Sequence, residues 1–191
     1  MKITLFWHRR DLRFQDNAGL AAALQSGHPV LPLFIYDQTI LEKLPPTDAR
    51  LTFIFDQVER LAHEAHAAGG GMLARYGRVP EVFGKLLKDY DIAAAYTNED
   101  YEPYATERDA AVAQLFEKHG VEFKAFKDQV IFVKEEIQTK NGKPHKVFGA
   151  YSKAWQAQVT PDDFKPHPSQ RLFKKENLAS PKAGDASRPT L

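Results

Sequence analysis

The stretch that decides the fold is Trp7-His8-Arg9-Arg10-Asp11-Leu12-Arg13-Phe14-Gln15-Asp16-Asn17. It follows an apolar run at residues 3–6 and precedes an Ala- and Leu-rich run at residues 18–25. The first run predicts a buried strand, and the apolar spacing of the second predicts a short helix. In an open α/β sheet the turn between them lies at the carboxyl end of the strand, where such folds bind ligands. An unpaired buried charge is costly, so we expect the charged residues of this turn to be paired, solvated or bound to a ligand.

The composition is that of a globular protein with one α/β domain. The chain has 191 residues, of which 43% are apolar and 27% are charged, and its net charge is +1. The sequence contains no cysteine, which excludes disulfides and a cysteine nucleophile and is typical of a reducing compartment. No apolar run approaches the roughly 20 residues of a membrane span. We therefore expect a cytoplasmic protein without a signal peptide or a membrane segment.

Strand and helix patterns alternate along the first 126 residues. Five strands are predicted, at residues 3–8, 29–36, 72–76, 92–97 and 121–126. The continuous apolar run at residues 29–36 indicates a strand buried on both faces. Apolar residues with helical spacing predict four helices between them, at residues 18–25, 48–68, 80–90 and 103–119. Residues 37–46 are expected to form a loop. These repeated units predict a Rossmann-like three-layer α/β/α fold with a five-stranded parallel sheet in the order 3-2-1-4-5.

Three loops at the carboxyl ends of the predicted strands are rich in charged and aromatic residues: 7–16, 34–50 and 98–104. In the expected order the switch point lies between the first and fourth strands, so the first and third loops flank one crevice and the second adjoins it. The arginines of the first loop have two interpretations. They either bind a ligand or pair with acidic residues and fix the turns. The expected pairing partners are Asp11, Asp16 and Glu99. For the crevice as a whole we favour a ligand, because aromatic and charged residues converge there.

Other patterns predict structure rather than chemistry. The run Gly69-Gly70-Gly71 precedes a strand rather than a helix, so we interpret it as a helix-ending segment and not as a phosphate loop. His63 and His66 share a predicted helix, but their spacing without a nearby acidic partner is not typical of a metal site. We therefore expect no metal site, and no set of residues indicates a catalytic group.

The character of the sequence changes after residue 126. Three aromatic residues recur at helical spacing and predict one face of a helix: Phe148, Tyr151 and Trp155. Together with Lys146 and Lys153 this segment could bind a nucleic acid strand. The interpretation we favour is a helix whose aromatic face packs against the core or a second domain.

The end of the chain has no periodic pattern. From Thr160 onward it is rich in Pro, Lys and Ser, which is typical of a linker or tail. We therefore divide the chain into an α/β domain at residues 1–159 and a linker or tail at residues 160–191.

Four segments, in order along the chain, resemble the amino-terminal domain of the photolyase/cryptochrome flavoproteins. The first is Arg9-Arg10-Asp11-Leu12-Arg13-x-x-Asp16-Asn17, and the second is Tyr101-Glu102-Pro103-Tyr104-x-x-x-Arg108-Asp109. The third is Lys127-Asp128-Gln129-Val130-Ile131, and the fourth is Lys146-Val147-Phe148-x-x-Tyr151-x-Lys153-x-Trp155. Gly149-Ala150 stands where the family usually has Thr-Pro. The resemblance covers residues 3–155.

The resemblance implies the antenna domain of a DNA photolyase, a carbon-carbon lyase. In this family a larger helical domain follows, binds FAD and repairs cyclobutane pyrimidine dimers in DNA by light-driven electron transfer. The present sequence lacks that domain, so we expect a fragment or a stand-alone domain that is not catalytic alone. The implied partners are the FAD-binding helical domain and, through it, DNA. The residues of the structural signature are Arg9, Arg10, Asp11, Arg13, Asp16 and Asn17.

Antenna domains of this family bind a folate, a deazaflavin or a flavin as a light-harvesting chromophore. The folate-binding subfamily has Asn-Glu where this chain has Tyr104-Ala105. The resemblance therefore implies FMN or an 8-hydroxy-deazaflavin rather than methenyltetrahydrofolate. Aromatic residues suit a flat ring, and polar groups suit its edge and side chain. The implied chromophore-binding residues are Phe34, Tyr36, Asp37, Arg50 and Asp100.

Three alternatives stay open at this point. The closest is a cryptochrome-type photosensor domain, because this part of the family serves both signalling and repair. The second is a stand-alone nucleotide- or flavin-binding α/β module. The third is a protein-interaction domain that uses the aromatic helix near residues 147–159.

Overall fold

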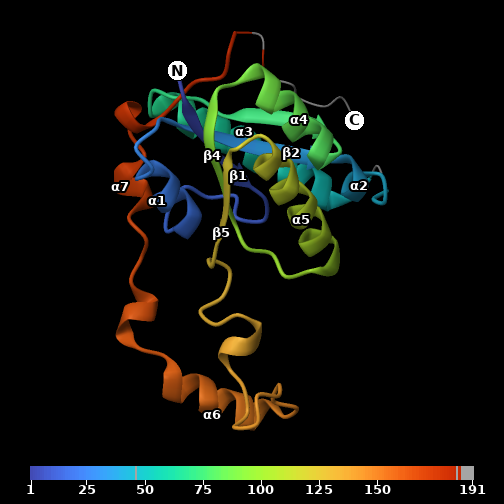
Figure 1. The fold of residues 1–191 in the computed structure, drawn as a ribbon, viewed down its shortest axis with the longest axis vertical. Coiled ribbons are helices and arrows are strands. Elements are labelled where there is room, and N and C mark those ends of the chain that lie inside the picture. Colours follow the sequence, from blue (N-terminus) through green and yellow to red (C-terminus); the bar gives the residue numbers. More distant parts are fainter. Residues whose placement is uncertain (46, 184, 186–191) are drawn as a thin grey trace.

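The computed structural model describes residues 1–45, 47–183 and 185. Its centre is a five-stranded sheet in which every pairing is parallel. The order is β3-β2-β1-β4-β5, as the sequence predicts. The strands are β1 (Ile3–His8), β2 (Val30–Asp37), β3 (Leu73–Gly77), β4 (Ile92–Asn98) and β5 (Glu122–Phe126). Figure 1 shows this sheet with helices in front and behind, so the predicted three-layer fold is confirmed.

Two hydrophobic clusters, one on each face of the sheet, form the core. Residues of α4 (Val79–Asp89) and α5 (Pro103–Lys118) pack on one face, and residues of α1 (Ala18–Leu24) and α3 (Ala49–Ala67) pack on the other. The strand β1 contributes to both faces, because successive side chains of a strand point to opposite sides. Leu5 and Trp7 join the α4–α5 cluster, whereas Phe6 joins the α1–α3 cluster. A strand buried on both faces explains the unbroken apolar run in the sequence.

The helices α1 and α3 begin at residues whose side chains cap them. Asn17 caps α1 by accepting a hydrogen bond from the backbone of Leu20 at 2.9 Å, and Asp48 caps α3. One local prediction is wrong, because residues 37–46 contain the helix α2 (Gln38–Leu41) rather than only a loop. Asp37 caps this helix. Four residues are too few to show an apolar period, so the pattern gave no signal.

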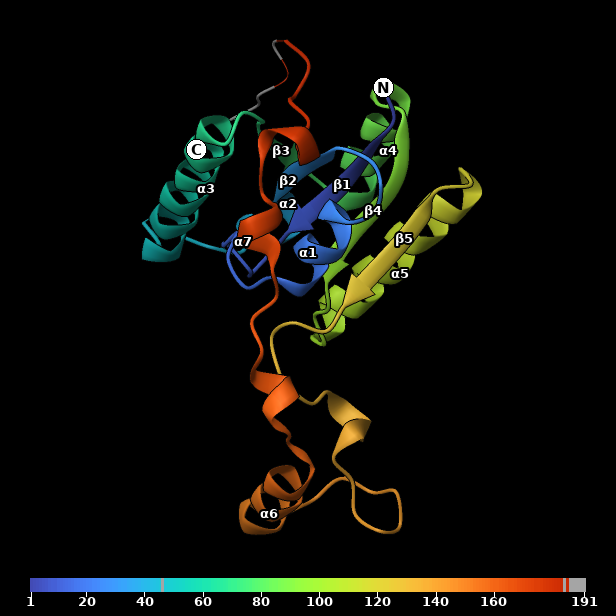
Figure 2. The ribbon, with the colours of Figure 1, turned by 90° about the vertical axis from the view of Figure 1, so that its left-hand side faces the viewer.

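Residues 127–168 form an arm that extends away from the sheet and returns to it (Figures 1 and 2). The arm holds η1 (Lys134–Glu136), α6 (Phe148–Gln158) and η2 (Pro161–Phe164). The expectation that the aromatic face of α6 packs on the core is wrong, since Phe148 is 81% exposed and no residue of α6 joins either core cluster. Packing of this face against a second domain stays a prediction.

After the arm, the chain packs back onto the α/β body through α7 (Ser169–Leu172) and η3 (Lys175–Asn177). Ser169 and Leu178 are buried, and Leu178 forms a parallel bridge with Val30 beside the sheet. This part of the predicted linker therefore lies against the body rather than extended from it. The domain boundary at residue 159 stays a prediction.

The glycine run at residues 69–71 ends α3 and also lets the returning chain approach closely. Gly69 has a φ of 86°, which favours glycine. A Cβ atom on Gly70 would lie 2.6 Å from Cβ of Leu178, and one on Gly71 would lie 2.5 Å from Cδ of Pro181. The backbone nitrogen of Gly71 donates to the carbonyl of Ala179 at 3.1 Å. The run therefore has a packing role in addition to the predicted helix-ending role.

Candidate functional site

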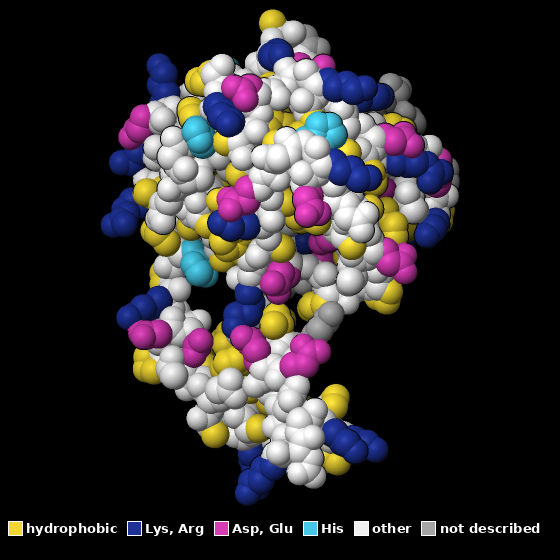
Figure 3. Space-filling model, in the orientation of Figure 1, with side chains coloured by type: hydrophobic (Ala, Val, Ile, Leu, Met, Phe, Trp, Pro, Cys, Tyr) yellow, Lys and Arg dark blue, Asp and Glu magenta, His cyan; other side chains and the backbone are white. Residues whose placement is uncertain are grey.

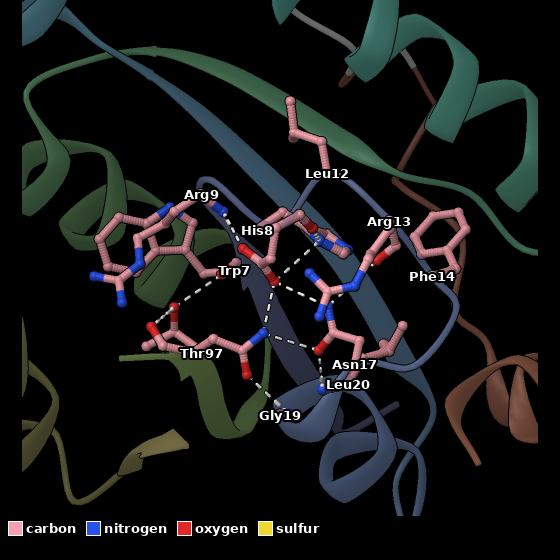
Figure 4. A network of polar contacts seen from close by, with 12 residues as sticks. Trp7, His8, Arg9, Leu12, Arg13, Phe14, Asn17, Gly19, Leu20 and Thr97 are labelled. Atoms are coloured by element: carbon pink, nitrogen blue, oxygen red, sulfur yellow. Dashed lines mark hydrogen bonds and ion pairs between the residues drawn. The ribbon is translucent and has the colours of Figure 1, made fainter. Parts of the chain in front are cut away.

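A buried polar network joins the carboxyl ends of β1 and β4 to the start of α1 (Figure 4). Asp11 accepts hydrogen bonds from the backbone nitrogen of Arg9 at 2.9 Å and from the side-chain amides of Asn17 and Asn98 at 2.9 and 2.8 Å. Asn98 also donates to Oδ1 of Asn17 at 2.9 Å and accepts from the backbone of Gly19 at 2.9 Å. Asp11 is 5% exposed and Asn98 is 2% exposed. We call Asp11, Asn17 and Asn98 the turn network.

The charge of Asp11 is stabilised by its surroundings. Burial raises the pKa of the Asp11 carboxyl, but its contacts with His8 and its hydrogen bonds with Arg9 and Asn17 lower it more. The net pKa therefore lies below the ordinary value of 3.8. His8 Nδ1 lies 3.6 Å from Oδ2 of Asp11, and the His8 ring is fully buried between Phe6 and Phe14.

All three arginines of the turn are paired. Arg13 donates to the backbone carbonyl of Asp16 at 2.9 Å, but the ion pairs of the described residues do not join any of the three to the expected carboxylates. Asp11 and Asp16 lie close in sequence and Glu99 lies in the third loop, whereas Arg9 and Arg13 use partners 100 and 115 residues away. The pairs are Arg9 with Asp109 at 2.5 Å, Arg10 with Asp100 at 3.3 Å and Glu102 at 2.6 Å, and Arg13 with Asp128 at 2.7 Å. Local spacing in sequence could not reveal contacts that only the tertiary fold creates.

The turn is also tied to the returning carboxyl-terminal segment. Asp16 adopts a φ of 45°, and its side chain accepts a hydrogen bond from the backbone of His167 at 2.8 Å. The backbone of Asn17 donates to Ser169 Oγ at 3.0 Å, and Ser169 Oγ donates to the carbonyl of Phe14 at 2.7 Å. These contacts support the structural role that the resemblance implies for the turn.

A pocket of about 350 Å³ opens beside the turn network, where the carboxyl ends of β1 and β2 meet α5. Residues from all three predicted loops line it, so the prediction that these loops border one crevice is confirmed. The structure brings together all five of the residues expected at the chromophore site: Phe34, Tyr36, Asp37, Arg50 and Asp100.

One wall of the pocket is apolar and aromatic. Tyr36 stacks on Phe55 with ring centroids 4.6 Å apart, and Phe34 meets Tyr36 edge-on at 4.9 Å. The segment around α2 and the first turns of α3 supply aliphatic side chains: Ile40, Leu41, Leu44 and Ile54. Such a wall suits one face of a flat ring system.

Another part of the lining is polar and internally hydrogen-bonded. Asp37 accepts a hydrogen bond from the hydroxyl of Tyr104 at 2.6 Å and lies 3.9 Å from Arg108. Burial and the bond to Asp37 raise the pKa of the Tyr104 hydroxyl. The buried guanidinium of Arg108 lies 4.7 Å from the Trp7 ring and 5.5 Å from the Tyr104 ring. These cation–π contacts fix the position of Arg108.

Two further arginines line the pocket and differ in exposure. Arg50 is 70% exposed and forms a two-pronged contact with Asp48 at 2.9 and 2.6 Å, which lowers the pKa of Asp48 to about 2. The Arg9 side chain is 7% exposed, and its Nη2 has no hydrogen-bond partner among the described residues. Burial lowers the pKa of Arg9 despite its contact with Asp109. A buried donor without a partner is unusual, and this atom has almost no accessible surface toward the pocket.

Trp7 and Tyr104 lie in loops that were predicted to border the crevice, but neither they nor Arg108 were expected as chromophore contacts. A signal for Arg108 existed, because it interrupts an otherwise apolar buried stripe on α5 that includes Ala105 and Val112. A charged residue in such a stripe points to a buried partner or a ligand. The aliphatic residues of α2 gave no comparable signal, because this helix was not predicted.

Neither a membrane-spanning helix nor a metal-binding cluster is found among the described residues. None of the described helices is long and apolar enough to cross a membrane. The same residues contain no group of three or more His, Cys, Asp or Glu side chains arranged to hold a metal ion.

The fold and the pocket define a Rossmann-like α/β domain with a pocket at the carboxyl ends of its strands. The chain belongs to the DNA photolyase family, whose model matches residues 4–171. It is 34% identical over 157 residues to a deoxyribodipyrimidine photo-lyase of Synechococcus sp., covering 82% of this chain and 32% of the relative. It is also 34% identical over 215 residues to a deoxyribodipyrimidine photo-lyase of Halobacterium salinarum, covering 98% of this chain and 44% of the relative.

Solved structures show the same fold. A bacterial class III photolyase from Agrobacterium tumefaciens superimposes with a TM-score of 0.81 at 24% identity, covering 98% of this chain and 37% of that structure. An archaeal photolyase from Sulfolobus tokodaii, described with two FAD molecules and a novel light-harvesting cofactor, has a TM-score of 0.66 at 24% identity. It covers 97% of this chain and 44% of that structure. The chain thus spans less than half the length of these relatives.

Proposed function

We propose that this chain is the light-harvesting, chromophore-binding domain of a deoxyribodipyrimidine photolyase. The observation that carries the proposal is the pocket at the switch point, which is lined by all five residues that the family resemblance implies. Its volume of about 350 Å³ falls within the range of roughly 300–1,000 Å³ that is typical of small-molecule sites.

The chromophore we propose is FMN or an 8-hydroxy-deazaflavin, rather than methenyltetrahydrofolate. The aliphatic and aromatic wall would contact the ring, as the apolar lining supports. Arg50 offers an exposed guanidinium for a polar edge or side chain. When bound, the dye absorbs light and passes the energy on. The residues of this chain hold it in a fixed orientation.

The partners we propose are the FAD-binding helical domain of a full-length protein and, through that domain, DNA. On the aromatic side of α6, Phe148 is 81% exposed, and this supports a contact with such a domain. The full-length protein would then be a cytoplasmic carbon-carbon lyase that repairs DNA with light, and this chain would not act alone. A cryptochrome-type photosensor stays the alternative, since the chain is also 27% identical over 139 residues to cryptochrome-2 of Gallus gallus.

A dye titration tests the proposed function. The purified chain is titrated with FMN, an 8-hydroxy-deazaflavin and methenyltetrahydrofolate in turn, and binding is followed by dye fluorescence. Arg50→Gln removes a pocket charge, and Arg78→Gln is its matched control, because Arg78 is exposed and does not line the pocket. We expect saturable binding of FMN or the deazaflavin, about tenfold weaker in Arg50→Gln and unchanged in Arg78→Gln. Saturable binding of none of the three dyes would contradict the proposal.

A further inference from the structure

The far end of the arm, residues 137–160, separates positive from negative charge. It contains four lysines, Lys140, Lys143, Lys146 and Lys153, and no aspartate or glutamate. The chain as a whole has a net charge of +1, so the remaining residues are net negative. We call these four lysines and the segment that carries them the basic arm tip. A local basic patch on a nearly neutral protein marks a surface for a polyanion.

The first two lysines lie on an ordered hairpin turn. Gln138 and Pro144 form an antiparallel bridge, and the backbone of Thr139 donates to the carbonyl of Lys143 at 2.9 Å. Thr139 Oγ1 accepts from the backbone of Lys143 at 3.1 Å. Gly142 closes the turn with a φ of 69°. The turn therefore fixes the backbone positions of these two lysines.

The lysines of the basic arm tip are exposed, and no ion pair is found for them among the described residues. Lysines at the base of the arm differ, because Lys127 pairs with Glu136 at 2.9 Å and Lys165 pairs with Asp162 at 2.6 Å. Figure 3 shows the same contrast: acidic side chains gather where the arm meets the body, and the far end of the visible face has basic ones.

The helix α6 keeps its basic and aromatic residues apart. Lys153 lies two residues after Tyr151 and two before Trp155, so at 100° per residue it falls on the side opposite to both. Lys146 precedes the first turn, which has no acidic residue and no side-chain cap. The amino end of the helix thus adds a small positive potential to that of the lysines. One side of α6 can therefore meet a polyanion while the aromatic side meets another domain.

We propose that the basic arm tip binds the phosphate backbone of duplex DNA, without reading its sequence. Lysines are compact charges on flexible stems, which suit phosphates at variable positions. Contacts of this kind position a protein on DNA and carry no sequence information. The choice of DNA over an acidic protein rests on the proposed function. This domain would then contact DNA directly, and not only through a second domain.

Fluorescence anisotropy with a labelled duplex of about 20 base pairs tests the inference, at several salt concentrations from about 25 mM upward. Each phosphate contact contributes about 0.9 to the slope of log affinity against log salt. For the whole chain we therefore expect a slope of about −3 to −4. Replacing Lys140, Lys143 and Lys146 with glutamine should reduce its magnitude by about 3 and weaken binding at least about tenfold at the lowest salt.

A matched control removes the same charge from the body, by replacing Lys85, Lys88 and Lys118 with glutamine. These lysines are exposed on α4 and α5, so the control should bind DNA nearly as the parent chain does. Equal loss in the two triple variants, or no binding by the parent at 25 mM salt, would overturn the inference. Tighter binding of labelled polyglutamate than of DNA would also overturn the inference, in favour of an acidic protein partner. Arg50→Gln should leave DNA binding unchanged, so a failed dye titration and a failed DNA titration are distinct results.

Discussion

Two groups of charged residues lie side by side at the carboxyl edge of the sheet, and they differ in how their charges are satisfied. In the turn network, Asp11 and Asn98 are almost fully buried and their polar atoms are bonded within the chain. In the pocket, the side chains of Arg10 and Arg50 are 53% and 70% exposed, and they pair with Asp100 and Asp48. The buried residues of the turn network thus stabilise the fold, whereas the exposed arginines line a pocket.

The difference follows from the cost of breaking each kind of pair. Removing one member of a buried charged network leaves the others without partners, and this costs about 3–5 kcal/mol. An exposed ion pair contributes about 0–1 kcal/mol, so it can exchange one partner for another at little cost. The comparison therefore predicts that changes in the turn network alter stability, whereas changes at the pocket rim alter binding.

The largest effect is expected for Asp11→Asn. The new amide group would face the donors of Asn17, Asn98 or Arg9, so at least one donor would lose its acceptor. We expect the free energy of unfolding to fall by about 3 kcal/mol, and the melting temperature to fall by roughly 6–12 °C for a chain of this size. Thermal and urea unfolding followed by circular dichroism measure this change. A loss below about 0.5 kcal/mol would show that the network does not hold the turn.

Lowering the pH should remove most of the difference in unfolding free energy between the parent chain and Asp11→Asn. The pKa of Asp11 lies below its ordinary value of 3.8 in the folded state, so its stabilising contribution is complete above 3.8 and is lost as the pH falls through the lower folded pKa. The stability gap between the parent chain and Asp11→Asn should therefore be constant near neutral pH and narrow below about pH 3.8. Urea unfolding of both proteins at a series of pH values checks this. A gap that widens in acid would contradict the sign of the shift.

The fold was largely predictable because its central strands β1, β2 and β4 are buried on both faces. The apolar runs gave the five strands, and the strand order followed from the alternation of strands and helices. The short helix α2 had too few residues to show a period. The close packing of Gly70 against Leu178 depends on chain segments more than 100 residues apart, which a local pattern does not contain.

The candidate site was predictable in its place but not in its detailed contacts. Strand order alone put the three loops around one crevice, because parallel strands end at the same edge of the sheet. The partners of Arg9 and Arg13 could not be read from the sequence, since each depends on how a distant helix or loop packs. Tyr104 and Asp37 likewise meet only in the tertiary structure.

A smaller effect, on binding rather than on stability, is expected for Asp100→Asn. Asp100 lines the pocket and pairs with Arg10, which also contacts Glu102 at 2.6 Å. Arg10 therefore keeps a carboxylate partner, and we expect unfolding to change by less than about 1 kcal/mol. The affinity for the dye that binds in the titration should fall about tenfold, as for the loss of one charge-assisted hydrogen bond. Unchanged dye affinity would remove Asp100 from the proposed site.

The smallest effect is expected for Tyr104→Phe. This change removes the hydroxyl that donates to Asp37 at 2.6 Å and keeps the ring that lies over Arg108. The loss should cost about 1 kcal/mol of stability, because Asp37 still caps α2 and stays near Arg108. Thermal unfolding measures it, with Tyr101→Phe as the control, since Tyr101 is exposed and does not line this pocket. Equal shifts in the two variants would show that the Tyr104 hydroxyl adds nothing to the site.

The division between a structural network and a binding pocket is tested most directly by comparing Asp11→Asn with Asp100→Asn. The two variants make the same chemical change, one in the turn network and one in the pocket. Unfolding free energy and dye affinity are measured for both variants and the parent chain under one set of conditions. The account predicts a stability loss of about 3 kcal/mol with little change in affinity for Asp11→Asn. It predicts an affinity loss of about tenfold with little change in stability for Asp100→Asn. Similar losses of both properties in the two variants would contradict the division between a structural network and a binding pocket.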